Sequence, residues 1–164
     1  MDLHQQFTSV IKENKGLIFK VSAMYTNSTD DRNDLQQEIV YQLWKSFGSF
    51  NQDSKLSTWM YRVALNTAIS HLKQTKRRVS TIPLDLDADR FAEDYDRTEE
   101  EQIQQLYAQI QSLNLLDRGI ILLFLEGKKY EEIASIIGIT PSNVGTRISR
   151  IKEKLRMQLT KQTA

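Results

Sequence analysis

Apolar residues recur at intervals of three and four along most of this chain, a spacing that predicts helices. The first predicted helix runs from about Leu3 to Tyr25, the second from about Arg32 to Phe47, and a third begins after Ser57. No segment alternates convincingly with period two, so little of the chain suits a β-sheet. These helices predict a small N-terminal bundle with one apolar core. Its expected core residues are Leu3, Phe7, Val10, Ile11, Leu17, Ile18, Val21, Leu35, Ile39, Leu43, Phe47, Met60, Val63, Ala64 and Leu72.

The helical period stops after Arg78 and resumes near Glu99. The stretch between the two is strongly acidic, because residues 79–101 contain nine Asp or Glu and two Arg. The parts on either side are each mildly basic, so the formal net charge of +1 conceals an uneven distribution. With one proline and no sustained period, residues 79–98 are predicted to form an acidic flexible linker.

A second group of helices follows the linker and includes one from Leu115 to Glu126 that is closed by Gly127. The predicted fold is therefore all-α, with two small helical domains, residues 1–78 and 99–164, joined by the acidic linker. Each domain has fewer than about 80 residues and is only marginally stable alone, so partner surfaces are expected to matter.

The segment from Tyr130 to Leu155 has the pattern of a helix-turn-helix. Gly138 supplies the backbone conformation that ends the first helix. Thr140 is placed to cap the second helix, and Pro141 suits its first position, where a missing N–H costs nothing. The apolar stripe of the two helices comprises Ile133, Ala134, Ile137, Val144, Ile148, Ile151 and Leu155.

The opposite face of the second helix carries hydroxyl, amide and guanidinium groups. Arginines can bind phosphates, while amides and hydroxyls can read base edges in a major groove. A solvated amphipathic hairpin is the alternative, but the glycine turn and the capped Thr-Pro start favour DNA binding. The residues of this face are Ser142, Asn143, Thr146, Arg147, Ser149 and Arg150.

Aromatic and basic residues interleave between Phe47 and Arg78. Aromatic rings can stack on unpaired bases while cations hold the backbone, which suits single-stranded DNA. The alternative is that Phe47 and one face of Trp59 belong to the core, and that the basic end of the helix complements its dipole. Asn66, a weak helix former inside a predicted helix, favours the nucleic-acid interpretation. The interleaved residues are Phe47, Phe50, Lys55, Trp59, Tyr61, Arg62, Lys73, Lys76, Arg77 and Arg78.

Several other classes of protein are disfavoured. The chain has no cysteine, which excludes disulfides and thiolate sites, and its two histidines, His4 and His71, are too few and too far apart for a metal site. No nucleophile–base pair or phosphate-cradling glycine loop is present, so neither enzymatic activity nor a cofactor is expected. Without a signal-peptide core or a run of about 18 apolar residues, no membrane insertion is expected and a cytoplasmic location follows.

Three motifs in this order resemble those of the bacterial extracytoplasmic-function (ECF) sigma factors, which keep only the second and fourth conserved sigma regions. The resemblance covers nearly the whole chain. The motifs are DLQQE at residues 34–38 followed by LW at 43–44, STWMYRVALN at 57–66, and YEEIA at 130–134 leading to RISR at 147–150.

This resemblance implies core RNA polymerase and promoter DNA as partners, with an anti-sigma factor as a third. The polymerase-binding positions it implies are Asp34, Leu35, Gln37 and Glu38. The loop from Phe50 to Ser57 corresponds to the segment that captures a base flipped from the single-stranded −10 element, and Trp59 to an aromatic residue at the melting point that is both wedge and core. The −10 candidates are Phe50, Lys55, Ser57, Trp59, Arg62, Asn66 and Lys73, and the candidates for the duplex −35 element are Ser142, Asn143, Thr146, Arg147, Ser149 and Arg150.

The chain departs from the family pattern at Gly145, where a basic residue is usual, and at Ser70 and Lys73. A DNA contact is therefore expected to be missing at Gly145. Two other functions remain open: a transcriptional regulator that binds duplex DNA without polymerase, and an adaptor that keeps the sigma fold only to bind an anti-sigma protein.

Overall fold

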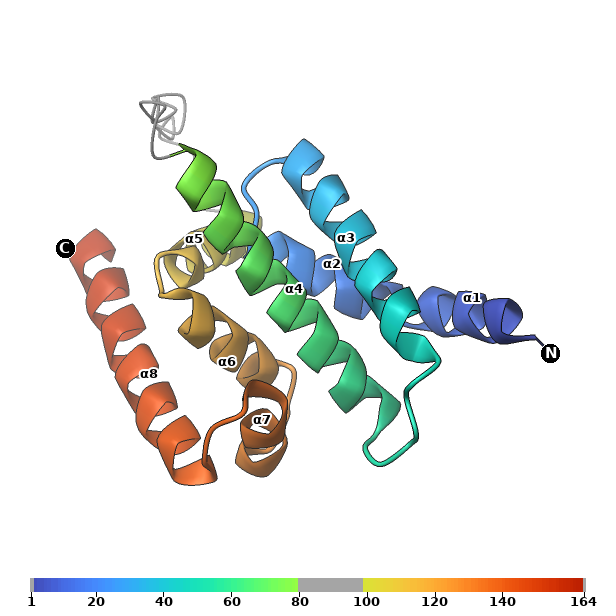
Figure 1. Cartoon of the computed structure of the whole chain (residues 1–164). Coiled ribbons are helices and arrows are strands. Elements are labelled where there is room, and N and C mark those ends of the chain that lie inside the picture. The colour runs from blue at the N-terminus through green and yellow to red at the C-terminus, as the bar shows by residue number, and fades with distance from the viewer. Residues whose placement is uncertain (1, 80–98, 164) are drawn as a thin grey trace.

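The computed structural model of the chain describes residues 2–79 and 99–163, which form eight helices and contain no strand (Figure 1). The predicted all-α fold is confirmed. Apart from Val79, the last residue of α4, the predicted linker lies outside the described residues. The helices are α1 (Leu3–Glu13), α2 (Lys15–Met24), α3 (Thr29–Phe47), α4 (Leu56–Val79), α5 (Glu99–Gln111), α6 (Leu115–Leu125), α7 (Tyr130–Ile137) and α8 (Pro141–Thr163).

The prediction of a single N-terminal helix is wrong, because Asn14 separates α1, which ends at Glu13, from α2, which begins at Lys15. The backbone of Asn14 has φ −119° and ψ 24°, and its side-chain Nδ2 donates a hydrogen bond of 2.8 Å to the carbonyl of Val10. An asparagine that bonds to nearby backbone offers the chain an alternative to the regular helical ladder. Gly16, with its low helix propensity, follows two residues later.

The first four helices share a core close to the predicted one. Val21 of α2, Leu35 and Ile39 of α3, and Ala64 of α4 are fully buried. Leu3 is a correction, because its side chain is 48% exposed instead of lying in the core. The first helix reaches the core through Phe7, one turn later, which leaves Leu3 at the outer end of α1.

Local signals set the boundaries in the second half as predicted. Gly127 and Gly138 have φ of 82° and 88°, the left-handed conformation that glycine adopts without strain, and each follows the end of a helix. The Thr140 hydroxyl accepts a hydrogen bond of 3.1 Å from the amide of Asn143, and Pro141 opens α8. The helix-turn-helix is therefore confirmed as α7, the turn and the first part of α8.

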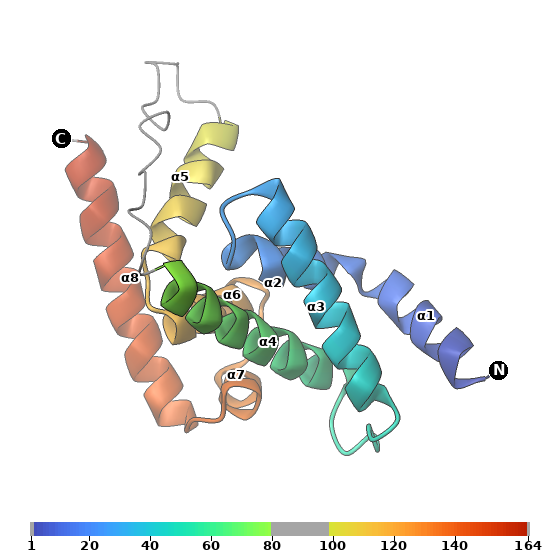
Figure 2. The same cartoon turned by 45° about the horizontal axis from the view of Figure 1, so that its top comes forward.

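The two halves pack on one another through α2 and α4 on one side and α6 and α7 on the other. Both views show α4 between α3 and the group formed by α6, α7 and α8, with α1 and α8 on opposite sides of the molecule (Figures 1 and 2). The buried apolar residues of the two halves form one continuous cluster.

Tyr25, at the C-terminal end of α2, is central to this contact. Its hydroxyl donates a hydrogen bond of 2.7 Å to the carbonyl of Leu115. A Cβ atom added at Gly119 would lie 3.1 Å from that hydroxyl and 3.4 Å from Cδ2 of Leu65, so the absence of a side chain allows α6 to approach this closely. The side-chain amide of Gln111 donates to the carbonyls of Ala23 and Thr26 and so ties α5 to the same end of α2.

Burial alters the acid–base behaviour of two tyrosines near the contact. Desolvation raises the pKa of Tyr25 far above its usual value, although the nearby Arg118 guanidinium acts in the opposite direction. Desolvation, together with the Glu126 carboxylate, raises the pKa of Tyr61 to about 12. Both side chains therefore stay neutral to a higher pH than an exposed tyrosine does.

We predict that Tyr25→Phe lowers the free energy of unfolding at pH 7 by about 0.5–1.5 kcal/mol, because the bond to Leu115 is lost. Since the folded-state pKa of Tyr25 exceeds its unfolded value of about 10, its contribution is complete below that pH and is lost as the pH rises above it. Urea unfolding at pH 7 and above pH 10 should show a smaller alkaline loss in the variant than in the parent. Tyr41→Phe, at an exposed ring, is the control, and equal alkaline losses in parent and Tyr25→Phe would contradict the prediction.

Candidate nucleic-acid and polymerase interface

The four polymerase-binding candidates lie on α3 but differ in exposure. Asp34 and Gln37 are exposed, and Glu38 is half-buried and accepts a hydrogen bond of 3.1 Å from the side-chain amide of Gln42. Leu35 is fully buried in the core. In this structure Leu35 therefore holds α3 against the core, and the surface available to a partner consists of its polar neighbours.

An open apolar groove lies beside Gln37, between α3 and the first two helices. It has a volume of about 930 Å³. Three of its aromatic residues, Phe19, Tyr41 and Trp44, are 49%, 54% and 39% exposed. The sequence analysis did not predict this groove. The available signal was that none of these three aromatic residues belongs to the predicted core. The full lining is His4, Phe7, Ile11, Lys15, Ile18, Phe19, Asn33, Gln36, Gln37, Val40, Tyr41 and Trp44.

A second groove, here called the loop groove, follows the turn between α3 and α4 and has a volume of about 770 Å³. Phe50 enters from the loop, and its ring lies 5.0 Å from that of Trp59, which in turn lies 6.2 Å from Phe47. Gln52 has a positive φ of 63°, which is uncommon outside glycine and is often found at functional sites. The loop groove is lined by Leu3, Gln6, Val10, Phe47, Gly48, Phe50, Gln52, Asp53, Ser54, Lys55 and Leu56.

The structure accommodates both interpretations of the aromatic residues. Phe47 and Trp59 are half-buried and pack against the core, which agrees with their interpretation as core residues. Phe50 is also half-buried and, like Phe47, lines the loop groove. The aromatic series therefore anchors the loop and also presents part of its surface to a groove.

Of the remaining −10 candidates, Lys55 directly precedes α4 and the other four lie along that helix. Ser57 and Arg62 are half-buried, whereas Asn66 and Lys73 are exposed. The Asn66 side chain lines a polar groove between α3 and α4 that also includes Glu38, so a polymerase candidate and a DNA candidate share one surface.

Two of these cations are bound by the second half of the chain. The Nη2 atom of Arg62 donates to the carbonyl of Ser135 at 3.0 Å and to its hydroxyl at 3.4 Å. Lys55 forms an ion pair of 4.0 Å with Glu132, which also pairs with Lys128 at 3.7 Å. The first turns of α7 thus lie against the −10 candidates, an arrangement that sequence reasoning did not predict.

The predicted DNA-binding face of α8 is largely exposed to solvent. The residues Ser142, Asn143, Thr146, Ser149 and Arg150 are exposed, and the Thr146 hydroxyl donates back to the carbonyl of Ser142. On one flank of this face Cε2 of Tyr130 would lie 3.4 Å from a Cβ added at Gly145, which is an ordinary van der Waals distance. A side chain at position 145 would therefore have to pass along the Tyr130 ring.

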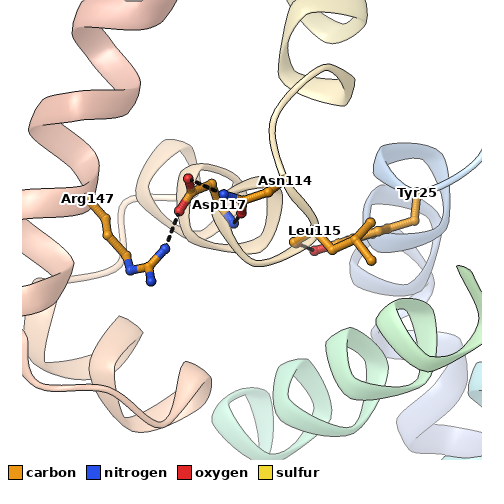
Figure 3. Close-up of polar contacts among 5 residues, drawn as sticks. All are labelled: Tyr25, Asn114, Leu115, Asp117 and Arg147. Carbon is orange, nitrogen blue, oxygen red and sulfur yellow. Dashed lines mark hydrogen bonds and ion pairs between the residues drawn. The ribbon is translucent and has the colours of Figure 1, made fainter. Parts of the chain in front are cut away.

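Arg147 differs from the other −35 candidates because it is half-buried and has an intramolecular partner. Its Nη1 atom lies 3.0 Å from Oδ1 of Asp117 on α6 (Figure 3). Asp117 is itself fixed by Asn114, whose side chain accepts from the Asp117 amide at 2.9 Å and donates to its carboxylate at 3.0 Å. The ion pair connects the N-terminal turn of α6 to the recognition helix.

No cluster of three or more His, Asp or Glu residues that could hold a metal ion occurs within residues 2–79 and 99–163. Within the same described ranges, none of the helices is long and apolar enough to cross a membrane.

Comparison with known families assigns both halves of the chain. The sigma-70 region 2 family matches residues 10–78, and the sigma-70 region 4 family matches residues 103–155. The chain is 30% identical to the RNA polymerase sigma factor SigV of Bacillus subtilis (strain 168) over 156 residues, which cover 93% of this chain and 90% of the relative. It is 33% identical to the ECF RNA polymerase sigma-E factor of Escherichia coli (strain K12) over 134 residues, 74% of this chain and 70% of that protein.

Two solved structures have a similar fold. One is the sigma factor RpoE in complex with the anti-sigma factor NepR from Bartonella quintana, with a TM-score of 0.73, 21% identity, and coverage of 95% of this chain and 98% of that one. The other is CnrH in complex with the cytosolic domain of CnrY, with a TM-score of 0.69, 18% identity, and coverage of 96% and 89%.

We predict that Arg147→Ala lowers the free energy of unfolding by about 1–3 kcal/mol, because it leaves the largely buried Asp117 carboxylate without its cation. Arg150→Ala is the matched control on the same helix and should change stability by less than about 0.5 kcal/mol, since Arg150 is exposed. Denaturant unfolding of the three proteins checks this. Equal stability of the two variants would show that the Arg147–Asp117 pair does not hold α8 to α6.

Proposed function

Because the chain belongs to the ECF group of the sigma-70 family of RNA polymerase sigma factors, we propose that its first half docks on polymerase and opens the −10 element while its second half reads the −35 element. As a sigma factor, the chain binds core RNA polymerase and directs promoter recognition and transcription initiation. The observation that carries this proposal is the presence of regions 2 and 4, in that order, in one chain.

The region 2 match also bears on the alternative functions. A regulator that acts without polymerase has no need of a sigma region 2, which here accounts for most of the first half, so this alternative is not favoured. The proposed role is one of binding and DNA opening, without enzymatic chemistry. It also places the chain in the cytoplasm, where bacterial RNA polymerase acts.

We assign polymerase docking to the exposed face of α3 around Asp34 and Gln37. These acidic and amide groups would complement a basic surface on the polymerase, and such charge complementarity favours rapid and specific association. The neighbouring apolar groove adds the exposed rings of Phe19, Tyr41 and Trp44, whose burial by a partner would contribute about 25 cal/mol for each Å² removed from water. Leu35 supports this surface from inside the core.

Opening of the −10 element is assigned to the loop groove and to α4. Extruding a base from the stack costs a few kcal/mol, which a pocket and stacked rings must offset. The loop groove provides the pocket, Phe50 provides a ring that lines it, and Trp59 packs against Phe50 from α4. Lys55 and Arg62 supply positive charge for the backbone, and the Asn66 amide can both donate to and accept from a base edge.

Reading of the −35 element is assigned to the first three turns of α8. Residues near the N-terminus of a recognition helix contact base edges, so Asn143 and Thr146 are proposed to discriminate bases. Arg150, exposed and farther along the same helix, is proposed to bind a phosphate. An anti-sigma factor is the remaining partner we propose, since one of the similar solved structures is a sigma factor in complex with an anti-sigma factor.

Reconstitution with core RNA polymerase tests the docking assignment. Asp34→Lys should weaken binding to core polymerase in about 0.15 M salt by roughly tenfold or more, because a buried contact between like charges replaces a favourable one. Glu13→Lys, which reverses another exposed acid of the first half, should bind core polymerase like the parent. Run-off transcription from a promoter selected from a random library should fall in parallel with core binding. Equal binding by the two variants would remove Asp34 from the interface.

Salt dependence tests the division of labour on α8. Loss of one phosphate contact in Arg150→Ala should reduce the slope of log affinity against log salt by about 0.9 and leave base preference intact. Asn143→Ala should do the reverse, keeping the slope while reducing discrimination at one −35 position. Arg156→Ala, nearer the C-terminus of the same helix, is the matched control for loss of an arginine. An unchanged slope with altered base preference in Arg150→Ala would place that arginine on a base edge.

A further inference from the structure

Tyr130, the first residue of α7, lies beside the recognition helix without belonging to it. Both views show α7 next to the first turns of α8 (Figures 1 and 2). Tyr130 is 41% exposed, and its Cε2 and Cδ2 atoms would lie 3.4 and 3.7 Å from a Cβ atom added at Gly145. Apart from the adjoining part of α8, no other described atom would come within 4 Å of that added atom. One edge of the aromatic ring therefore flanks a stretch of helix that carries no side chain.

Contacts that involve α6 and α8 support this ring. Phe124 of α6 is half-buried and packs against the core, and its ring centroid lies 6.5 Å from that of Tyr130 at an interplanar angle of 46°. The Nζ atom of Lys152, on α8, lies 4.4 Å from the centroid of the Phe124 ring. The aromatic pair thus joins α6, α7 and α8, and it supports the Tyr130 ring where that ring meets Gly145.

Gly145 lies in the part of α8 that is placed to meet bases. It is the fifth residue of a helix that begins at Pro141, so it belongs to the second turn. Ser142 and Ser149, three residues before and four after it, lie on the same side of the helix and are exposed. Residues in the N-terminal turns of a recognition helix contact base edges in the major groove. The bare backbone at Gly145 therefore allows a base edge to approach both α8 and the Tyr130 ring closely.

We infer that Tyr130 is a specificity-determining residue of −35 recognition, and that its ring contacts the 5-methyl group of a thymine that lies over Gly145. The atoms that border this space are carbons, two from the ring edge and the Cα of the glycine. The thymine methyl is the apolar group that base pairs present in the major groove, where apolar and aromatic side chains contact it. Cytosine and uracil carry hydrogen at the same ring position, so this contact separates thymine from both. Tyr130 thereby supplies a contact at the position where the sequence analysis expected one to be missing.

The inference rests on the proposed reading of the −35 element by α8, so its test uses the full chain bound to core polymerase. A promoter is first selected from a random library with the parent protein. Each −35 thymine is then replaced in turn by deoxyuridine, which lacks only the 5-methyl group, and the equilibrium affinity of the polymerase complex is measured. At one thymine the parent should lose roughly threefold to tenfold in affinity, because one methyl group is removed from contact with apolar surface.

Three variants and a control locate the origin of this loss. Tyr130→Ala should bind the thymine and uracil forms with affinities within about twofold of each other, whereas Tyr130→Phe keeps the ring and should show the parent's loss. Gly145→Ala should also reduce the loss, because its methyl group occupies the space beside the ring at an ordinary van der Waals distance. Since alanine favours a helix, Gly145→Ala carries the test if circular dichroism shows that Tyr130→Ala is unfolded. Tyr107→Ala removes a tyrosine of the same half that is 44% exposed, and it should lose as much affinity as the parent when the methyl group is removed.

The inference is overturned if the parent tolerates every uracil, or if a folded Tyr130→Ala loses as much affinity as the parent at each thymine. The same conclusion follows if Tyr130→Ala is unfolded and Gly145→Ala keeps the full loss. Weaker binding of Tyr130→Phe to all templates, with a smaller dependence on salt, would place the Tyr130 hydroxyl on a phosphate and would also overturn it. If no promoter can be selected with the parent and core polymerase, the proposed function itself fails, an outcome distinct from a selected promoter without methyl sensitivity.

Discussion

The close approach of α6 to α2, made possible by Gly119 lying against Tyr25, is the constraint on which the arrangement of the molecule depends. Each half alone would have a small core and marginal stability. Joining the cores through Tyr25, Leu65 and Gly119 gives one larger apolar interior. The same contact determines which polar faces remain outside, since α4 and α7 meet along it.

Features with local causes were predictable from the sequence. The turn between α7 and α8 follows from Gly138, Thr140 and Pro141, each of which acts within a few residues of its own position. The break at Asn14 was not predicted, because a side chain that bonds to the preceding turn interrupts the helix without interrupting its apolar period. Leu3 continued that same period but lies beyond the part of α1 that reaches the core.

The candidate site was predictable in its residues more than in its contacts. Helical period alone places Asn143 and Arg150 on the exposed face of α8 and Asp34 on that of α3. It also placed Leu35 among the core residues, which conflicts with the partner-binding role that the family motif suggested for it. The bonds of Arg62 to Ser135 and Arg147 to Asp117 join residues 73 and 30 positions apart, and such contacts depend on how helices pack, which a periodic pattern does not encode.

The bond between Arg62 and Ser135 places the second half of the chain against a residue that we propose binds promoter DNA. If Arg62 binds the −10 strand as proposed, its hydrogen bonds to Ser135 compete with DNA, and the apparent affinity for the strand then equals the intrinsic affinity multiplied by the fraction of molecules in which those bonds are open. Any partner that holds α4 and α7 apart removes this penalty before DNA arrives. If polymerase separates the two halves on binding, the polymerase-bound chain would bind promoter DNA more tightly than the free protein does.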